Sequence, residues 1–250
     1  MKKAILCGAC GRMGKWVAND AEKQGFKIVC GINPNGKQYA DFPVYDSFSQ
    51  VSEEADVVID FSLPEALTEL LDFITAKKMP AVLCVTGYSE EQISAIEKAA
   101  EKTPIFRSHN MSMGVYVLNR LALQAKKLLP DFDIEIIERH HRNKADAPSG
   151  TALTLYEALK TENSKPIIGR NEKSGKRESL DIGISAVRGG SINGIHEVCF
   201  LGEGENITIE HVAESRSIFA TGALKAAAFI INKPPKIYGM EDYFNNLLKL

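Results

Sequence analysis

The chain has little net charge and no long apolar run, and each absence excludes a class of protein. Its 250 residues include 30 Lys and Arg against 32 Asp and Glu, a net charge of −2. A net charge this small does not predict binding to nucleic acid or to acidic membranes. Any anion must therefore be bound by a local cluster of cations. No stretch reaches the roughly 18 apolar residues of a membrane span. The apolar run at the N-terminus stops at Gly8, too early for a signal peptide, which favours a cytoplasmic protein.

Cysteine is also scarce. The five cysteines are odd in number and stand mostly in apolar segments, which is typical of reduced thiols in a cytosolic protein, so no disulfide is expected. Cys7 and Cys10 form a Cys-x-x-Cys pair, for which redox chemistry or half a zinc site is the alternative reading. No second pair follows to complete a four-ligand site, so we expect no metal.

The first hundred residues alternate between short apolar strands and helical patterns. Strands are expected over residues 4–7, 26–32, 56–61, 81–86 and 105–107. Capping boxes at Ser62 with Glu65 and at Ser89 with Gln92 mark two of the intervening helices. This rhythm predicts an α/β fold with a Rossmann-like, doubly wound parallel sheet, which binds ligands at the carboxyl ends of its strands.

A glycine turn follows the first strand. Gly8, Gly11 and Gly14 have the spacing Gly-x-x-Gly-x-x-Gly, rather than the commoner Gly-x-Gly-x-x-Gly, and lead into a helical pattern. Glycines let the backbone approach a pyrophosphate, and a helix N-terminus supplies N–H donors for it. The order strand, glycine turn, helix therefore predicts a dinucleotide site.

The acidic residue that usually binds the ribose, about 20 residues beyond such a turn, is missing. Asn33 stands there, with Lys37 close behind. An asparagine can bond a ribose without repelling a 2′-phosphate, and a lysine can pair with that phosphate, so NADPH is expected to be tolerated as well as NADH. An ordinary Asn-Gly turn beside a solvated lysine accounts for the same residues equally well.

The second half of the chain has a different pattern. Helices are expected over residues 114–129 and 151–160, a strand over 133–138, and a flexible polar connection over 161–179. Three strand-like runs follow, over 181–188, 195–201 and 207–213. Because no helix separates them, they predict antiparallel pairing in a second α+β domain with a mixed or antiparallel sheet. A small-residue helix over 217–231 is expected to return to the first domain, with residues 237–244 as a final cover.

The densest group of functional side chains follows the strand at 133–138. His140, His141 and Lys144 lie within five positions, and Ser149, Gly150 and Thr151 then stand at a helix start. Hydroxyls beside the N–H groups of a helix N-terminus suit the binding of a carboxylate. The imidazoles and the ammonium could then donate a proton to the molecule that carries this carboxylate. A solvated basic turn before a capped helix is the alternative. His196, in a later glycine-rich turn, is expected to be structural.

These motifs resemble those of the 4-hydroxy-tetrahydrodipicolinate (dihydrodipicolinate) reductase family of diaminopimelate and lysine biosynthesis. The resemblance covers essentially the whole chain. It rests on Gly8-x-x-Gly-Arg-Met-Gly, Asp60-Phe-Ser, Thr86-Gly, Asn110-Met-Ser-x-Gly-Val and above all Glu138-x-His-His-x-x-Lys-x-Asp-Ala-Pro-Ser-Gly-Thr-Ala. It implies an oxidoreductase that reduces a cyclic dicarboxylate imine with NADH or NADPH. The implied domains are 1–112 for the dinucleotide, 113–216 for substrate and homotetramer formation, and 217–250 as the return to the first domain.

The resemblance also implies residue roles. His140 is the implied proton donor and Lys144 a second donor that also holds the substrate, whose carboxylates His141, Ser149, Gly150 and Thr151 would bind. The implied cofactor residues are Gly8, Ala9, Cys10, Gly11, Arg12, Met13, Asn33, Cys84, Val85, Thr86, His109, Asn110, Met111 and Ser112. Three positions depart from the family. Asn33 replaces a frequent acid, Cys84-Val85 a frequent Gly-Thr, and Met111 a frequent Phe, which affects cofactor preference and nicotinamide packing but not the chemistry.

Two other functions compete with this interpretation. One is a different two-domain dehydrogenase, acting on aspartate or its semialdehyde; the basic loop with its hydroxyl-glycine cradle favours a small dicarboxylate instead. The other is a nucleotide-sensing regulator that has lost its chemistry, against which the intact His140 and Lys144 argue.

Overall fold

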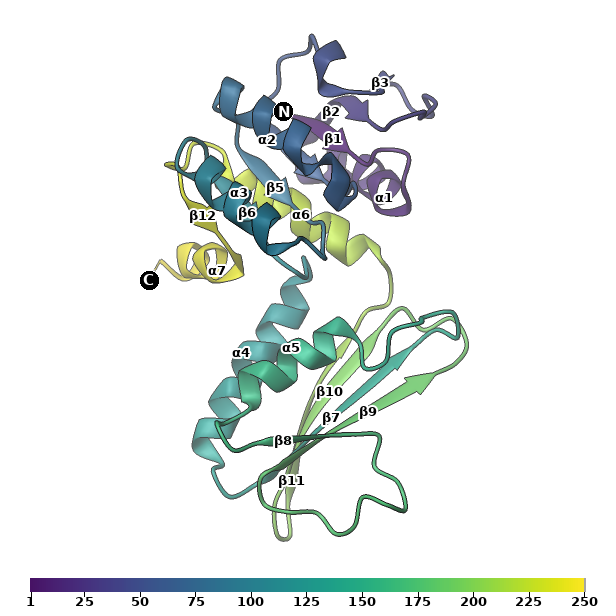
Figure 1. Cartoon of the computed structure of the whole chain (residues 1–250), viewed down its shortest axis with the longest axis vertical. Helices are drawn as coiled ribbons and strands as arrows, with labels where there is room; N and C mark the ends of the chain where they lie inside the picture. The colour runs from purple at the N-terminus through teal and green to yellow at the C-terminus, as the bar shows by residue number, and fades with distance from the viewer. Residues whose placement is uncertain (250) are drawn as a thin grey trace. The chain divides into compact units, whose positions relative to one another are not determined.

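The computed structural model describes residues 1–249 and divides into two compact units (Figure 1). The first unit comprises Met1–Met111 together with the C-terminal segment from Arg216, and the second comprises Ser112–Ser215. Residue 250, the last of the expected C-terminal segment, lies outside the described residues. Among the described residues, no helix is long and apolar enough to cross a membrane.

The first unit is built on a seven-stranded sheet in the order β12-β6-β5-β4-β1-β2-β3. All its recorded pairings are parallel, which confirms the predicted doubly wound sheet. The strands are β1 (Lys2–Cys7), β2 (Phe26–Ile32), β3 (Val44–Tyr45), β4 (Val57–Asp60), β5 (Ala81–Leu83), β6 (Ile105–Arg107) and β12 (Ile237–Tyr238). The order reverses beside β1, so the loops after β1, β4, β5 and β6 meet at one edge, where this fold binds ligands.

Helices pack against this sheet. They are α1 (Arg12–Asp20), α2 (Leu67–Lys77), α3 (Glu90–Ala100), α6 (Ser217–Ile230) and α7 (Met240–Leu248), with 3₁₀ turns η1 (Glu22–Gln24), η2 (Phe48–Gln50) and η3 (Pro64–Ala66). α1 contacts α6, and α2 contacts α3. α6 lies close to the strands through small residues, and a side chain at Gly222 would overlap the Met111 carbonyl. The C-terminal residues add β12 to the edge of the sheet beside β6.

Two local expectations for the first unit were wrong. Ser62 does not cap a helix, because its hydroxyl donates to Asp60 Oδ1 at 2.6 Å and a 3₁₀ turn from Pro64 precedes α2. β5 ends at Leu83, so residues 84–86 belong to the loop that follows. The box at Ser89 is present, with the Gln92 N–H donating to Ser89 Oγ and the Gln92 side chain accepting from the Ser89 N–H.

The second unit is a five-stranded mixed sheet in the order β11-β10-β7-β9-β8, with two helices on one face (Figure 1). The elements are α4 (Met113–Leu128), β7 (Asp133–His140), α5 (Gly150–Leu159), β8 (Lys165–Ile168), β9 (Asp181–Arg188), β10 (Ile195–Leu201) and β11 (Asn206–Val212). Alternate residues of the central strands, such as Ile134, Ile136 and Val198, pack against Leu118 and Leu155 of the helices. The opposite sheet face carries the intervening residues.

The sheet order corrects three expectations. β10 pairs antiparallel with β11 as predicted, but β9 does not join them, because β7 lies between β9 and β10 and pairs parallel with β9. The connection over residues 161–179, expected to be flexible, contains β8. β7 continues to His140, two residues beyond the predicted end, so His140 stands on the same strand as Glu138 rather than in the loop that follows.

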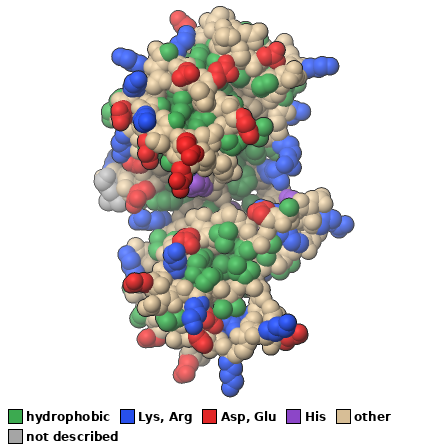
Figure 2. Space-filling view, viewed as in Figure 1, with side chains coloured by type: hydrophobic (Ala, Val, Ile, Leu, Met, Phe, Trp, Pro, Cys, Tyr) green, Lys and Arg blue, Asp and Glu red, His purple; other side chains and the backbone are tan. Residues whose placement is uncertain are grey.

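On the face shown in Figure 2, Lys and Arg side chains are interspersed with Asp and Glu in each unit. Binding of a charged molecule must therefore depend on particular side chains, as the small net charge predicted.

Candidate active site

A fully buried carboxylate, Glu138 on β7, is the centre of the candidate site. Its side chain is 0% exposed. Arg188 donates to both carboxylate oxygens, Nη1 to Oε2 at 2.7 Å and Nη2 to Oε1 at 2.8 Å. The Ser149 N–H donates to Oε1 at 2.9 Å. Burial raises the pKa of Glu138, but the bonds from Arg188, His140 and Ser149 outweigh it and hold the pKa below its usual value, so the carboxylate is ionised.

His140 lies two residues further along β7, on the same buried face. Its Nδ1 is 2.6 Å from Glu138 Oε2. An ionised carboxylate only accepts hydrogen bonds, so Nδ1 carries a proton and donates it. The other nitrogen, Nε2, faces Gly194, where a Cβ would stand 3.0 Å from it. Burial lowers the pKa of His140, Glu138 raises it, and Lys144 and Arg188 lower it, with a net decrease.

The N-terminus of α5 lies beside this pair. Ser149 is its N-cap, with Oγ accepting from the Ala152 N–H at 3.2 Å, and Gly150 begins the helix. Ser149 Oγ is also 3.1 Å from His196 Nε2. A neutral imidazole can either accept from this hydroxyl or donate to it, depending on its tautomer, and burial lowers the pKa of His196 to about 4. The predicted structural role of His196 therefore fits a contact with the helix cap.

The loop between β7 and α5 holds Lys144. Its Nζ is 2.8 Å from an oxygen of Asp146, two residues on. The loop is fastened to the β9–β10 turn, where the N–H of His141 donates to the Ile192 carbonyl at 2.8 Å. Arg188 Nη2 also donates to the Asp146 carbonyl at 2.6 Å. The structure thus brings His140 and Ser149 to one buried carboxylate, with Lys144 in the loop that joins them.

The first unit places the predicted glycine turn between β1 and α1. Gly8 has φ +70°, and a side chain there would overlap the Phe61 backbone; one at Gly14 would overlap the Gly8 and Ala9 carbonyls. Gly11 is the N-cap of α1, with no side-chain cap bond. The turn is therefore a tight backbone cradle that leads directly into a helix N-terminus.

The other predicted cofactor residues lie around the same edge of the sheet. Asn33 follows β2, and its Oδ1 accepts from the Cys10 N–H at 3.2 Å, which ties that loop to the glycine turn. Cys84, Val85 and Thr86 follow β5, and His109, Asn110 and Met111 follow β6. Val85 and Met111 are buried. Ser112 belongs to the second unit, as the N-cap of α4.

Three residues of the site in the second unit had no predicted role. They are Glu138, Arg188 and Gly194. The spacing of Glu138 was a usable signal, because residues that stand two apart on a strand point to the same face, as Glu138 and His140 do. Arg188 and Gly194 lie about fifty residues further along, and only the pairing of β7 with β9 and β10 brings them close.

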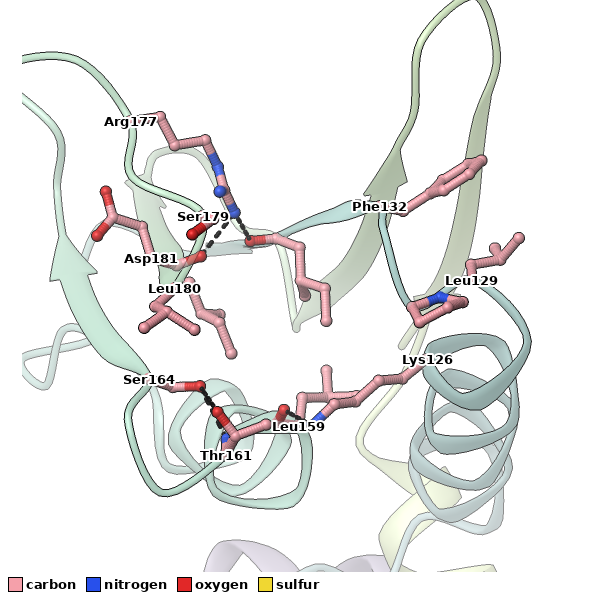
Figure 3. Close-up of a pocket in the computed structure, with 13 residues that line it drawn as sticks. Lys126, Leu129, Phe132, Leu159, Thr161, Ser164, Arg177, Ser179, Leu180 and Asp181 are labelled. Atoms are coloured by element: carbon pink, nitrogen blue, oxygen red, sulfur yellow. Dashed lines mark hydrogen bonds between the residues drawn. The ribbon is translucent and has the colours of Figure 1, made fainter.

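A separate cavity of about 290 Å³ lies at the opposite end of β7, around Ile134 and Ile182 (Figure 3). Its cations are already engaged with backbone oxygens. Arg177 donates to the carbonyls of Ile134 and Asp181, and Lys126 to that of Leu159. Arg177 is also paired with Asp133 and Glu135, so its charge is already balanced.

Comparison with known proteins agrees with the two-unit division. The family model for the N-terminus of dihydrodipicolinate reductase matches residues 2–111, and the model for its C-terminus matches residues 114–244. Two curated relatives are named 4-hydroxy-tetrahydrodipicolinate reductase. The one from Caldanaerobacter subterraneus subsp. tengcongensis is 48% identical over 97% of this chain and 98% of its own. The one from Clostridium tetani is 46% identical, with 98% of each chain covered.

A solved structure shows the same fold. Dipicolinate-bound dihydrodipicolinate reductase from Paenisporosarcina sp. TG-14 superposes with a TM-score of 0.79 and 23% identity, covering 96% of this chain and 97% of that one. The matches of both family models, at their expected halves, confirm the resemblance drawn from the motifs. The chain belongs to the dihydrodipicolinate reductase family.

Proposed function

We propose that this chain reduces 4-hydroxy-tetrahydrodipicolinate to tetrahydrodipicolinate with NADH or NADPH, as a cytoplasmic enzyme of diaminopimelate and lysine biosynthesis. The names of its relatives support the reaction. The observation that carries the chemistry is the His140 ring, whose Nδ1 is bonded to Glu138 while Nε2 faces the space at Gly194. A ring held in this way can release a proton from Nε2 only.

The glycine turn fits a nicotinamide dinucleotide, because side chains are excluded at Gly8 and Gly14 and the backbone can approach a pyrophosphate. When bound, the cofactor supplies the hydride. In this proposal residues 1–112 form the dinucleotide-binding domain, and the loops of Asn33, Cys84–Thr86 and His109–Ser112 line it together with the turn from Gly8 to Met13.

Both cofactors are expected to bind. Asn33 carries no charge that would repel a 2′-phosphate, and it is already bonded to Cys10 N–H. Lys15 lies above the Tyr39 ring, 5.6 Å from its centroid, and Tyr39 Oη donates to the Ala9 carbonyl at 2.8 Å. These contacts place one ammonium near the turn, and Lys37 and Arg12 add exposed cations beside it.

The substrate carboxylates are assigned to the N-terminus of α5. Gly150 and Thr151 would bind one carboxylate there, helped by His141, since a helix N-terminus favours an anion. Ser149, whose N–H donates to Glu138 and whose hydroxyl is bonded to His196 and Ala152, would hold that helix end in place for them. Lys144 would pair with the substrate, and its present partner Asp146 is 58% exposed, so that ion pair costs little to break. The 4-hydroxyl group of the substrate would leave as water to give the conjugated ring that accepts the hydride, and His140 would donate a proton from Nε2 to that ring after hydride transfer.

The experiment is to replace His140 with Gln and follow oxidation of NADPH and of NADH with enzymatically generated substrate. Turnover should fall by roughly two to four orders of magnitude, the usual contribution of a general acid, with little change in cofactor affinity. Turnover close to that of the wild type would remove His140 from this role. Cofactor binding without turnover in the wild type would favour the regulator, and oxidation of aspartate or its semialdehyde the other dehydrogenase.

A homotetramer built by the second unit, within the proposed domain 113–216, is part of the proposal. The sheet face opposite α4 and α5 carries a row across four strands, made by Val187, Arg139, Ile195 and Val212. Val187 and Val212 are 48% and 46% exposed. Apolar side chains on an open sheet face favour association with another sheet. Analytical ultracentrifugation should give four times the monomer mass, and Val187→Glu should lower it.

A further inference from the structure

We propose that Glu138 and Arg188 act together as positioning residues for His140, the carboxylate fixing the ring with a proton on Nδ1 and the guanidinium holding that carboxylate and balancing its charge. This inference rests on the proposed role of His140 as the proton donor. Neither Glu138 nor Arg188 is among the residues proposed to bind the substrate carboxylates or the cofactor.

Saturation of the carboxylate is the first argument. Glu138 accepts four hydrogen bonds, two from Arg188, one from the Ser149 N–H and one from His140 Nδ1. A buried carboxylate with four donors is rigid and ionised. His140 therefore cannot turn its other nitrogen toward Glu138 without losing a charge-assisted bond. The transferable proton is confined to Nε2.

The charges around His140 give the second argument. Glu138 favours the imidazolium, whereas Arg188 and Lys144 oppose it. The titratable and charged groups that face the ring or its neighbours come from four strands and the loop: Glu138 on β7, Arg188 on β9, His196 on β10, His211 on β11, and Lys144 and Asp146 in the loop. With a full negative charge and no counterion, Glu138 would hold the imidazolium too strongly for it to release a proton. Arg188 offsets part of that attraction.

Arg188 also reaches the loop. The Nη2 that binds Glu138 Oε1 is 2.6 Å from the Asp146 carbonyl. One guanidinium thus holds the carboxylate that orients His140 and the backbone beside Lys144. Both proposed proton-bearing side chains depend on its position.

A purely structural ion pair would have a different signature. Breaking a buried pair destabilises a protein whichever partner is removed, because the other charge is left unpaired. Positioning predicts in addition opposite effects on His140, since removing Glu138 takes away a negative charge and removing Arg188 a positive one. The direction of the shift in the His140 pKa separates the two roles.

The test compares Glu138→Gln, Arg188→Gln and the charge-conserving Arg188→Lys. The readouts are the titration of the His140 ring by nitrogen-15 NMR and the alkaline limb of the pH profile of kcat. Because the donor must be protonated, activity falls as pH rises through the His140 pKa. Glu138→Gln should move that limb to lower pH and lower kcat roughly 10- to 100-fold. A loss of that size is usual when the hydrogen-bond partner that orients a functional histidine is removed. Arg188→Gln should move it to higher pH, and Arg188→Lys should leave it near the wild type.

Shifts of the same sign in both Gln variants, or no shift in either, would overturn the inference. If Glu138→Gln fails to fold, the two Arg188 variants decide, because a limb unmoved in Arg188→Gln contradicts the charge balance. Failure of the proposed function looks different. His140→Gln would then keep its turnover, while the NMR titration of His140 in the Arg188 variants would still report whether the charge balance exists.

Discussion

The candidate sites of the two units are built from different chemical groups. In the first unit the candidate cradle is backbone: α1 begins after Gly11 with no side-chain cap bond, and glycines stand where side chains would overlap the chain. In the second unit the helix begins at a bonded serine, Ser149, beside a buried carboxylate and two imidazoles. A site of the first kind depends on space, and a site of the second kind depends on hydrogen bonds and protonation. Substitutions should therefore impair binding or turnover for different physical reasons in the two units.

The largest effect on cofactor binding is expected where space is removed from the glycine turn. Gly8→Ala would place a methyl group against the Phe61 backbone at φ +70°, so the turn must move. We expect cofactor affinity, measured by fluorescence titration with NADPH, to fall by about a hundredfold or more, corresponding to nearly 3 kcal/mol.

Gly25→Ala is the matched control, because Gly25 has a similar φ of +77° but nothing within 4 Å of an added Cβ. It should cost only about 1–2 kcal/mol of stability, the strain of a left-handed residue, and leave cofactor binding intact. Equal losses of affinity in both variants would show that backbone strain, not space, limits the turn.

The next effect tests the charged site. Lys144→Ala should lower kcat and raise KM together, by about a hundredfold in kcat/KM, because it removes a charge that binds substrate and a second proton donor. Steady-state kinetics at several substrate concentrations measures both. Arg142→Ala, two residues away in the same loop, is the control and should change kcat/KM only a few-fold. If the melting temperature alone changed in Lys144→Ala, the solvated-turn interpretation would be correct.

Acid should destabilise the second unit through His196. Its folded pKa of about 4 lies below the unfolded value of about 6.5, so the unfolded chain takes up the proton first as pH falls. Stability is therefore lost between these two values. From pH 7.5 to pH 5 the loss should be about 2 kcal/mol, roughly thirtyfold in the folding equilibrium.

Urea denaturation at the two pH values measures this loss. In His196→Gln the free energy of unfolding should differ between the two pH values by about 2 kcal/mol less than in the wild type. A variant as acid-sensitive as the wild type would show that His196 is charged in the folded state.

The same contrast explains how far the sequence could predict the molecule. In the first unit β1 pairs with β2, β4 with β5 and β5 with β6, each across one connecting α-helix, so the alternation of strands and helices was enough to predict a parallel sheet. In the second unit β7 pairs with β9 and β10, which follow it by more than forty residues, and nothing local in residues 181–188 shows that β7 separates that strand from β10.

The candidate site divides in the same way. Composition predicted the cluster from His140 to Thr151, and the structure brings His140 and Ser149 to the two oxygens of one carboxylate. Arg188 could not be predicted, because its role depends on the register that sets it opposite His140 in the parallel pair. A residue whose contacts are all distant in sequence leaves no local pattern.

The smallest effect is expected at Gly194, where the space available beside His140 matters within the charged site. In Gly194→Ala the new methyl would stand 3.0 Å from His140 Nε2 and 3.4 Å from Cδ2, on the nitrogen proposed to release the proton. We expect kcat to fall about tenfold, or 1.4 kcal/mol in the barrier, with cofactor affinity unchanged. Gly189→Ala, in the same turn with nothing within 4 Å, is the control and should behave as the wild type. If both variants kept full turnover, the proton would have to leave His140 by a path that does not pass Gly194, and the charged site would not depend on space at all.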